Sequence, residues 1–277
     1  MKVTKFSGEV VLLDKEKLQN SLRKSGADDS AVFQVMHEID RQLYEGIPTK
    51  KIYKLAFQLL KKFSNAHAAR YNLRAAVQAL GPAGFYFEKF VARLFELEGY
   101  QTQTNLILEG KCISHELDVL LKKENSVAMI ECKFHGNQDA KSDVKVPLYI
   151  LSRFNDLKEK EFTVFGANYQ INHCWIATNN RFTEDAIKFA TCSNLHLLSW
   201  DYPKGNSLKS KIDSAQIYPV TCLTTLTLLE KDKLLMQELI TVKDLIAESG
   251  WLSKIGISKN RIKNVLKEAN QLCNFIQ

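Results

Sequence analysis

The feature that most constrains this chain is the stretch HELDVLLKKENSVAMIECKFH, residues His115–His135. Two apolar runs flank a polar centre, Lys122–Asn125, and this pattern predicts a β-hairpin. Asp118, Glu131 and Lys133 nevertheless lie inside the apolar runs. Charged side chains rarely enter a strand that packs in a core unless they are paired or bind a metal ion. The hairpin must therefore provide a partner for each of these three charges.

Side chains alternate between the two faces of a strand, so Glu131 and Lys133 share one face. If Glu124–Asn125 is a two-residue turn, Asp118 faces Glu131, with Cβ atoms roughly 5 Å apart. Two carboxylates so placed repel each other unless a cation neutralises them. Oxygen ligands favour Mg²⁺ or Mn²⁺. Lys133 is then placed to hold a water molecule or to offset charge on a phosphate.

The alternative is a solvent-facing hairpin in which Glu131 simply pairs with Lys133. The residues after Ser126 are apolar on both faces, which favours a buried central strand. Burial makes unneutralised charge costly. The residues by themselves leave both interpretations open.

Composition indicates a globular protein. The chain has 277 residues, 25% charged and 45% hydrophobic, enough for two or three domains. No apolar run approaches the roughly 20 residues of a membrane helix, and no secretory signal is evident, so we expect a cytoplasmic protein without membrane association. Six cysteines without a C-x-x-C pair predict free thiols rather than zinc sites. A net charge of +7 permits a nucleic-acid or nucleotide partner.

The chain divides into three blocks, and its overall class is α/β. Residues 1–63 predict a strand pair around Ser7–Gly8, then three helices: one from Asp14 to Gly26, one over 30–44, and one capped by Thr49. Residues 64–205 alternate helices and strands. Residues 215–277 are helical, and within them 224–240 is a core or dimer helix.

Within the central block, the pattern predicts a helix over 66–80, a break at Gly81–Gly84 and an amphipathic helix from Phe85. Strands follow, and then a helix near 143–157. HCWIAT, residues 173–178, predicts a further strand, followed by a helix capped by Thr183 and a last strand, LHLLSW.

The central block resembles the PD-(D/E)XK nucleases, and among them the Mrr-like (type IV) restriction endonucleases, over roughly residues 80–200. Asp118 stands at the position of the motif's first acid, and Glu131-Cys132-Lys133 stands as its E-x-K. The segment Gly84–Tyr100 resembles the family's first helix, and Cys174–Leu198 resembles its later strand, helix and strand. The sequence departs from the family pattern in two ways: Leu117 fills the proline-like position, and there is no clear Q-x-x-x-K motif. In place of that motif, Lys145, Tyr149 and Arg153 are the candidate substrate contacts.

This resemblance implies a restriction-endonuclease-like fold and Mg²⁺- or Mn²⁺-dependent hydrolysis of DNA phosphodiester bonds. Asp118 and Glu131 would hold the metal with the Cys132 carbonyl, and Lys133 would orient the water. Glu88, at the position of the family's helical acid, would reach the metal through water or bind a second ion; the alternative is a solvated residue beside Lys89. We expect His115 and His135 to be hairpin-end or DNA-facing residues rather than zinc ligands.

Residues Val3–Leu18 resemble the start of an ATP-cone, which binds ATP or dATP in ribonucleotide reductases. The resemblance implies that Val3 meets the base through its backbone, that Lys5 and Lys17 meet phosphates, and that Thr49 starts a helix near the base. The usual K-R-D-G turn is Lys5-Phe6-Ser7-Gly8 here, lacking one cation and one acid. Ordinary surface lysines are the alternative. There is no P-loop.

Near the end of the chain, four lysines and an arginine fall within fourteen residues that contain no acid: Lys254, Lys259, Arg261, Lys263 and Lys267. The segment faintly resembles a helix-hairpin-helix, whose turn amides bind a DNA phosphate. The alternative is a solvated cationic helix face.

The leading hypothesis is a DNA endonuclease, a homo-oligomer, whose activity ATP or dATP tunes. One alternative is a non-catalytic, nucleotide-responsive DNA-binding regulator that keeps the fold as a scaffold. Another is a junction resolvase or RNA nuclease with the same metal chemistry. The sequence does not distinguish substrate structure, ATP from dATP, or activation from inhibition.

Overall fold

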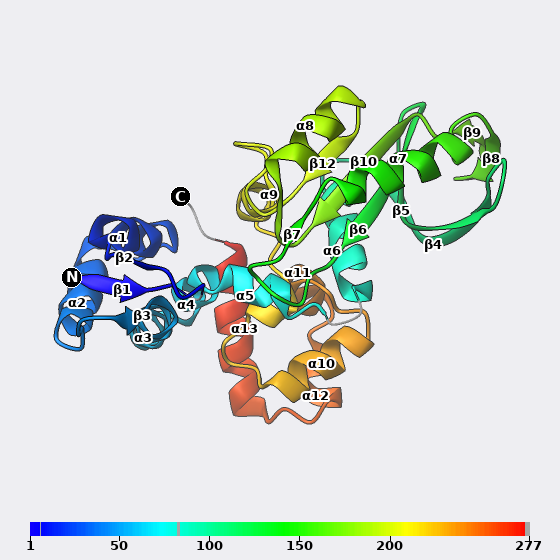
Figure 1. Ribbon diagram of the computed structural model, residues 1–277. Coiled ribbons are helices and arrows are strands. Elements are labelled where there is room, and N and C mark those ends of the chain that lie inside the picture. Colours follow the sequence, from blue (N-terminus) through cyan, green and yellow to red (C-terminus); the bar gives the residue numbers. More distant parts are fainter. Residues whose placement is uncertain (6, 82–83, 275–277) are drawn as a thin grey trace. The chain divides into compact units, whose positions relative to one another are not determined.

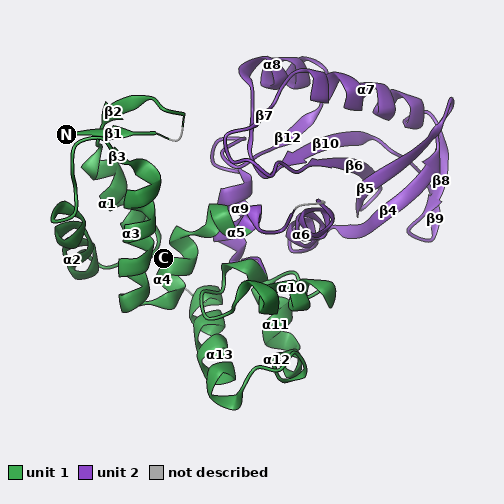
Figure 2. Ribbon diagram, turned by 60° about the horizontal axis from the view of Figure 1, so that its bottom comes forward, with its two compact units in different colours: residues 1–76, 220–277 green, residues 77–219 purple. Residues whose placement is uncertain are grey.

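The computed structural model describes residues 1–5, 7–81 and 84–274. Phe6 of the predicted first turn and Pro82–Ala83 of the predicted break lie outside the described residues. The chain forms two compact units, here called the helical unit (residues 1–76 and 220–277) and the sheet unit (residues 77–219) (Figure 2). The first and last sequence blocks thus fold together.

The N-terminal part of the helical unit is a small sheet covered by helices (Figure 1). Its strand order is β2-β1-β3, with β1 (Lys2–Thr4) antiparallel to β2 (Val10–Leu12) and parallel to β3 (Ile47–Pro48). The helices are α1 (Lys15–Lys24), α2 (Asp29–Asp40) and α3 (Thr49–Phe63). Asp14 caps α1 by accepting from the backbone N–H of Lys17, as the sequence predicts.

Three local predictions in this region are wrong. The second helix ends at Asp40 rather than near residue 44. Thr49 does not cap α3: Pro48 occupies the N-cap position, no side chain caps the helix, and Thr49 is its first residue. The predicted helix over 66–80 is two helices, α4 (Asn65–Tyr71) and α5 (Leu73–Gln78). At the junction, the Tyr53 hydroxyl lies 2.8 Å from Asn72 Oδ1 and 3.0 Å from the Tyr71 carbonyl.

The C-terminal part of the helical unit comprises a 3₁₀ turn, η1 (Val220–Cys222), and the helices α10 (Leu228–Met236), α11 (Val242–Ala247), α12 (Gly250–Lys254) and α13 (Lys259–Cys273). The helix, glycine-containing turn and helix that the segment LSKIGISKNRIKNVLKEA indicates are present as the end of α12, a turn with Gly256 at φ +92°, and α13. Arg70 of α4 joins this part to the N-terminal part, because its Nη2 donates to the carbonyls of Gln271 and Leu272 at 2.8 and 3.0 Å.

The sheet unit is a five-stranded mixed sheet between helices, with strand order β12-β10-β6-β5-β4. Its strands are β4 (Gln101–Glu109), β5 (Ser114–Lys123), β6 (Ser126–Lys133), β10 (His173–Thr178) and β12 (His196–Leu198). The first three pair antiparallel, and β6, β10 and β12 pair parallel.

Helices cover both faces of this sheet (Figure 2). One face carries α7 (Lys145–Leu157) and α8 (Glu184–Cys192), and the other carries α6 (Phe85–Glu96), which also contacts α9 (Leu208–Ala215). Short strand pairs lie outside this sheet: β7 (Lys141–Ser142) with β11 (Arg181–Phe182), and β8 (Glu161–Val164) with β9 (Ala167–Gln170). The helix cap at Thr183 is confirmed by its bond from Ala186 N.

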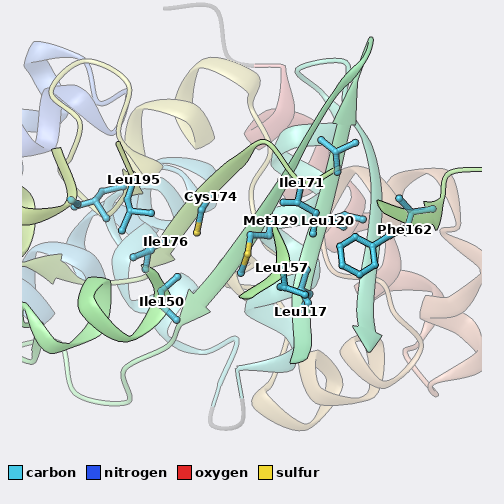
Figure 3. Close-up of a cluster of buried hydrophobic side chains, with 14 of the residues drawn as sticks. Leu117, Leu120, Met129, Ile150, Leu157, Phe162, Ile171, Cys174, Ile176 and Leu195 are labelled. Atoms are coloured by element: carbon cyan, nitrogen blue, oxygen red, sulfur yellow. The ribbon is translucent and has the colours of Figure 1, made fainter. Parts of the chain in front are cut away.

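One core cluster of the sheet unit lies between the sheet and the helices of the α7 face (Figure 3). Leu117, Leu120 and Met129 of the hairpin are fully buried there beside Ile150 and Leu157 of α7. Each such side chain contributes roughly 1.5–3 kcal/mol of burial. Residues Val127–Cys132 of β6 are all buried, so the predicted buried central strand is confirmed and the solvent-facing hairpin is excluded.

The predicted hairpin register is also confirmed. Glu124–Asn125 forms the turn, with Glu124 at φ 55°, and Lys123 faces Ser126. The paired ladder runs to Val119 facing Ile130 and ends one position before Asp118 and Glu131. The two acids therefore lie where the strands begin to separate.

All six cysteines are free, four of them buried. In the part of the chain that the structure describes, no helix combines the length and the apolar character that crossing a bilayer requires.

Candidate active site

Asp118 ties the two hairpin strands together beyond the end of their ladder. Its Oδ2 accepts a hydrogen bond of 2.6 Å from the backbone N–H of Cys132. The side chain is half-buried, and it lies one position beyond the last β5–β6 pair, which is Val119 with Ile130. The bond fixes the carboxylate beside the E-x-K segment of β6.

Glu131 is a buried charge with two cationic partners. It is 4% exposed. Lys133 Nζ donates to its Oε1 at 2.6 Å, and Arg153 of α7 donates to its Oε2 through Nη1. Arg153 also donates to the Glu116 carbonyl on β5. Such pairing is what allows a carboxylate to be buried at all, because an unpaired buried charge is very costly.

Glu88 approaches this place from the opposite layer, at the start of α6. The helix begins after Gly84, whose φ of +85° strongly favours glycine. Phe134, which directly follows Lys133, packs against Phe87 with ring centroids 5.8 Å apart and ring planes tilted by 54°. A Cβ atom added at Gly81 would lie 2.2 Å from the Phe134 ring, so this close approach requires glycine. Together these contacts hold the first turn of α6 against the end of β6.

The acids influence one another electrostatically. Burial, and after it the charge of Glu131, raises the pKa of Asp118 to about 6. Burial, followed by the charges of Asp118, Glu116 and Glu131, raises the pKa of Glu88 to about 7. Lys133 opposes both shifts without cancelling them. The site therefore holds more negative charge than its two cations neutralise.

This donor set fits a divalent cation. Two carboxylates and a backbone carbonyl are hard oxygen ligands of the kind Mg²⁺ and Mn²⁺ prefer, and a bound cation would favour the ionised form of Asp118. Within the described residues, no group of three or more His, Cys, Asp or Glu side chains is arranged to hold a metal. An ion here would therefore be held by Asp118 and Glu131, with carbonyl or water ligands completing its shell.

The two histidines that flank the motif have structural partners. His115, the second residue of β5, is 7% exposed, and its Nε2 lies 2.8 Å from Asp156 Oδ2, so of the two places expected for it, it occupies the hairpin end. This contact is the main cause that lowers the pKa of Asp156 to about 2. His135 is half-buried, and its Nε2 lies 2.8 Å from Ser142 Oγ.

The sequence does not predict that Arg153 pairs with Glu131. Lys145, Tyr149 and Arg153 were all candidate substrate contacts, but the Arg153 side chain is only 11% exposed and is committed to Glu131. Lys145 and Tyr149 are exposed on the same helix. A basic residue on the helix after a strand that buries a glutamate is the signal that could have identified this pair.

The residues of the predicted nucleotide site lie in the helical unit. The Val3 side chain is buried in the central strand β1, and Thr49 directly follows Pro48, which faces Thr4. Lys5 is exposed and pairs with Glu9 at 2.9 Å. Lys17 is exposed on the first turn of α1. The strands and helix predicted for this segment are present, while both lysines occupy ordinary solvent-exposed positions.

Two family models match the chain. Residues 82–202 match a restriction endonuclease family, Mrr_cat, and residues 218–273 match "AF1548-like, C-terminal". The sheet unit is thus restriction-endonuclease-like, as the sequence indicates. Both matches lie C-terminal to the segment predicted to bind nucleotide.

Two relatives each cover about two thirds of the chain. An uncharacterized protein of Archaeoglobus fulgidus is 33% identical over 186 residues, which are 66% of this chain and 99% of that protein. The crystal structure of the protein of unknown function AF1548 superposes with a TM-score of 0.56 and 30% identity, covering 68% of this chain and 97% of that one. The MspJI restriction endonuclease bound to an oligonucleotide is a distant neighbour, with 12% identity, a TM-score of 0.34, and coverage of 52% and 31%, too remote to bear on substrate.

Proposed function

The chain belongs to the AF1548-like family, and on that premise we propose that it is a Mg²⁺- or Mn²⁺-dependent endodeoxyribonuclease. The observation that carries this proposal is the open end of the β5–β6 hairpin. There Asp118 is fixed to the backbone of Cys132, and the buried Glu131 bonds to Lys133. All of these residues lie within the segment that matches a restriction endonuclease.

Each side chain receives a role from its position. Asp118 and Glu131, with the Cys132 carbonyl, would hold the divalent ion, which supplies Lewis-acid stabilisation of the phosphate and a more acidic water. Lys133, whose ammonium lies on the carboxylate of Glu131, would orient the attacking water and offset charge that develops on the phosphate. Glu88, with its raised pKa, would hold a proton or a water molecule at the edge of the site.

The test is cleavage of plasmid, linear duplex, single-stranded DNA and RNA with Mg²⁺. Asp118→Ala is expected to reduce DNA cleavage by on the order of a thousandfold while the chain stays folded. A purified Asp118→Ala protein that still degrades DNA would show that the assignment is wrong. Preference for RNA or for branched DNA would redirect the proposal to the other nucleases of the same chemistry.

A non-catalytic DNA-binding regulator is the second candidate, and one observation favours it. Both carboxylate oxygens of Glu131 are already engaged, one by Lys133 and one by Arg153. A scaffold that never binds metal would keep such pairs permanently. Calorimetric titration with Mn²⁺ separates the two candidates, because only the nuclease loses ion binding when Glu131 is changed to Ala.

We further propose that the N-terminal part of the helical unit binds ATP or dATP and tunes cleavage. The resemblance of Val3–Leu18 to an ATP-cone supports this, as does the register that brings Thr49 next to the end of β1. Lys5 and Lys17 would contact phosphates, and Val3 would contact the base through its backbone. Lys5→Ala/Lys17→Ala is expected to weaken ATP binding about tenfold or more, consistent with loss of charge-assisted contacts. Equal ATP affinity in the double variant would refute these contacts.

A further inference from the structure

Charge is divided unequally between the two units. The helical unit has 22 basic and 14 acidic residues, whereas the sheet unit has 16 basic and 17 acidic residues. The unit that contains the candidate active site therefore has no net attraction for a polyanion. Since phosphate contacts supply most of the non-specific affinity of a protein for DNA, cations of the more basic helical unit would add to the affinity for a DNA substrate.

Within the helical unit, α13 carries a row of lysines on its solvent side. Lys259, Lys263 and Lys267 are spaced four residues apart, and all three are exposed. At 1.5 Å per residue the row is about 12 Å long. One DNA strand places three to four phosphates over roughly that length of helix axis.

The remaining surface of α13 has the same chemical character. Its other exposed residues are all amides: Asn260, Asn264, Asn270 and Gln271. The one acid of the helix, Glu268, is 1% exposed and accepts from the backbone N–H groups of Thr224 and Thr225. The exposed face thus offers only cations and amides, which are the donors that contact phosphate oxygens in protein–DNA complexes.

The three lysines are also available. Among the described residues none of them pairs with a carboxylate. Arg261 of the same helix, by contrast, is bound to both carboxylate oxygens of Glu230 and to the Thr225 carbonyl. The helix is anchored by its opposite side, where Val265, Ala269 and Leu272 are buried. The lysine row is therefore not needed to hold the helix in place.

We propose that the Lys259–Lys263–Lys267 face of α13 binds the phosphate backbone of duplex DNA. This inference rests on the proposed function, because it names the surface that supplies affinity for the substrate of the sheet unit. It concerns binding, which is measured without metal and without cleavage.

The test measures the binding of duplex DNA to the full chain. Binding is monitored by fluorescence anisotropy in EDTA over a range of KCl concentrations. Lys259→Gln/Lys263→Gln/Lys267→Gln is expected to weaken binding on the order of 10- to 100-fold near 0.1 M salt. The slope of log K against log salt should become shallower by about 2 to 3, since each lost phosphate contact contributes about 0.9. An unchanged melting temperature is expected, as the three side chains are exposed.

A control variant removes the same charge from the same unit without removing a row. Lys24, Lys62 and Lys233 are exposed on three different helices, α1, α3 and α10. Their replacement by Gln is expected to change the slope by less than about 1. Equal losses in the two triple variants would overturn the proposal in favour of net charge alone. Binding to anionic lipid vesicles through the α13 lysines, without duplex affinity, would also overturn it.

The outcome is separable from that for the active site. If the α13 variant binds duplex normally while Asp118→Ala abolishes cleavage, this inference fails and the nuclease stands. If the α13 variant loses duplex binding while Asp118→Ala still cleaves, the binding face stands and the catalytic assignment fails.

Discussion

The end of the β5–β6 hairpin and the N-terminal lysines present charged residues in opposite ways. Glu131 is 4% exposed and is bonded to Lys133 and Arg153. Lys5 and Lys17 are exposed, and Lys5 pairs with Glu9, which is more exposed still. The hairpin charges have been removed from water at considerable cost, whereas the lysines are solvated as surface lysines usually are.

This difference between buried and exposed charges indicates which sequence motifs can be recognised in the structure of the free protein. A motif whose charges must be buried forces the fold to supply partners, and these partners can be seen in the free protein. A motif of exposed lysines makes no such demand, so its ligand has to be demonstrated directly. The experiments that follow compare the two regions with matched substitutions.

The largest contrast is expected between Lys133→Met and Lys5→Met. Each change removes one ammonium and keeps an unbranched side chain. The first is expected to lower Mg²⁺-dependent cleavage on the order of a thousandfold, because in the proposed mechanism the ammonium beside Glu131 acts on the scissile phosphate. The second is expected to leave cleavage without nucleotide unchanged. The cleavage rates are measured under single-turnover conditions. Similar losses of cleavage from both changes would mean that the hairpin lysine is no more important for cleavage than the N-terminal lysine.

A second contrast concerns stability. Arg153→Ala leaves Glu131 with Lys133 alone, so we expect a loss of roughly 2 to 3 kcal/mol in the free energy of unfolding. Arg41, which pairs with Glu38 at the surface of the helical unit, is the control, and Arg41→Ala is expected to cost about 0.5 kcal/mol or less. Urea denaturation measures both. Equal losses of unfolding free energy would indicate that the Arg153–Glu131 pair stabilises the fold no more than a surface ion pair does.

A third prediction concerns pH. The pKa of Asp118 is raised to about 6, so below pH 6 a proton competes with the metal ion. The affinity for Mn²⁺ is expected to fall about tenfold per pH unit there and to level off above the pKa of Glu88, about 7. Glu88→Gln should remove the upper part of this dependence. ATP binding to the helical unit, measured as a control, should lack the inflection near pH 6.

The raised pKa of Asp118 also affects the stability of the metal-free protein, and here a rise in pH is unfavourable. A carboxyl whose folded pKa is raised from 3.8 to about 6 binds its proton more tightly in the folded state. Its contribution therefore destabilises the fold as pH rises from about 4 to 6. Saturating Mn²⁺ is expected to reverse the loss at neutral pH, visible as a rise in melting temperature.

Much of the hairpin was predictable because its constraints are local. Strand alternation and the two-residue turn fix which residues face each other, and the apolar residues on both faces of β6 fix its central position. The register then leads directly to Asp118 beside Glu131. The caps of α1 at Asp14 and of α8 at Thr183 were predictable for the same reason.

Other features depend on contacts between distant segments and were not predictable. The rotation of α7 about its axis decides whether Arg153 faces the substrate or Glu131, and the helical pattern alone does not determine it. At the break between α4 and α5, Asn72 contacts the hydroxyl of Tyr53, about twenty residues earlier in the chain. The joining of residues 1–76 with 220–277 depends on contacts such as Arg70 with the Gln271 carbonyl.

The most direct test of the central claim is calorimetric titration of the full-length protein with Mn²⁺ at pH 7.5 or above. The wild type is expected to bind an ion at a site that Asp118→Ala and Glu131→Ala each abolish, while Lys5→Met binds as the wild type does. Binding that is unchanged in both acid variants would contradict the claim that these two carboxylates share a metal ion.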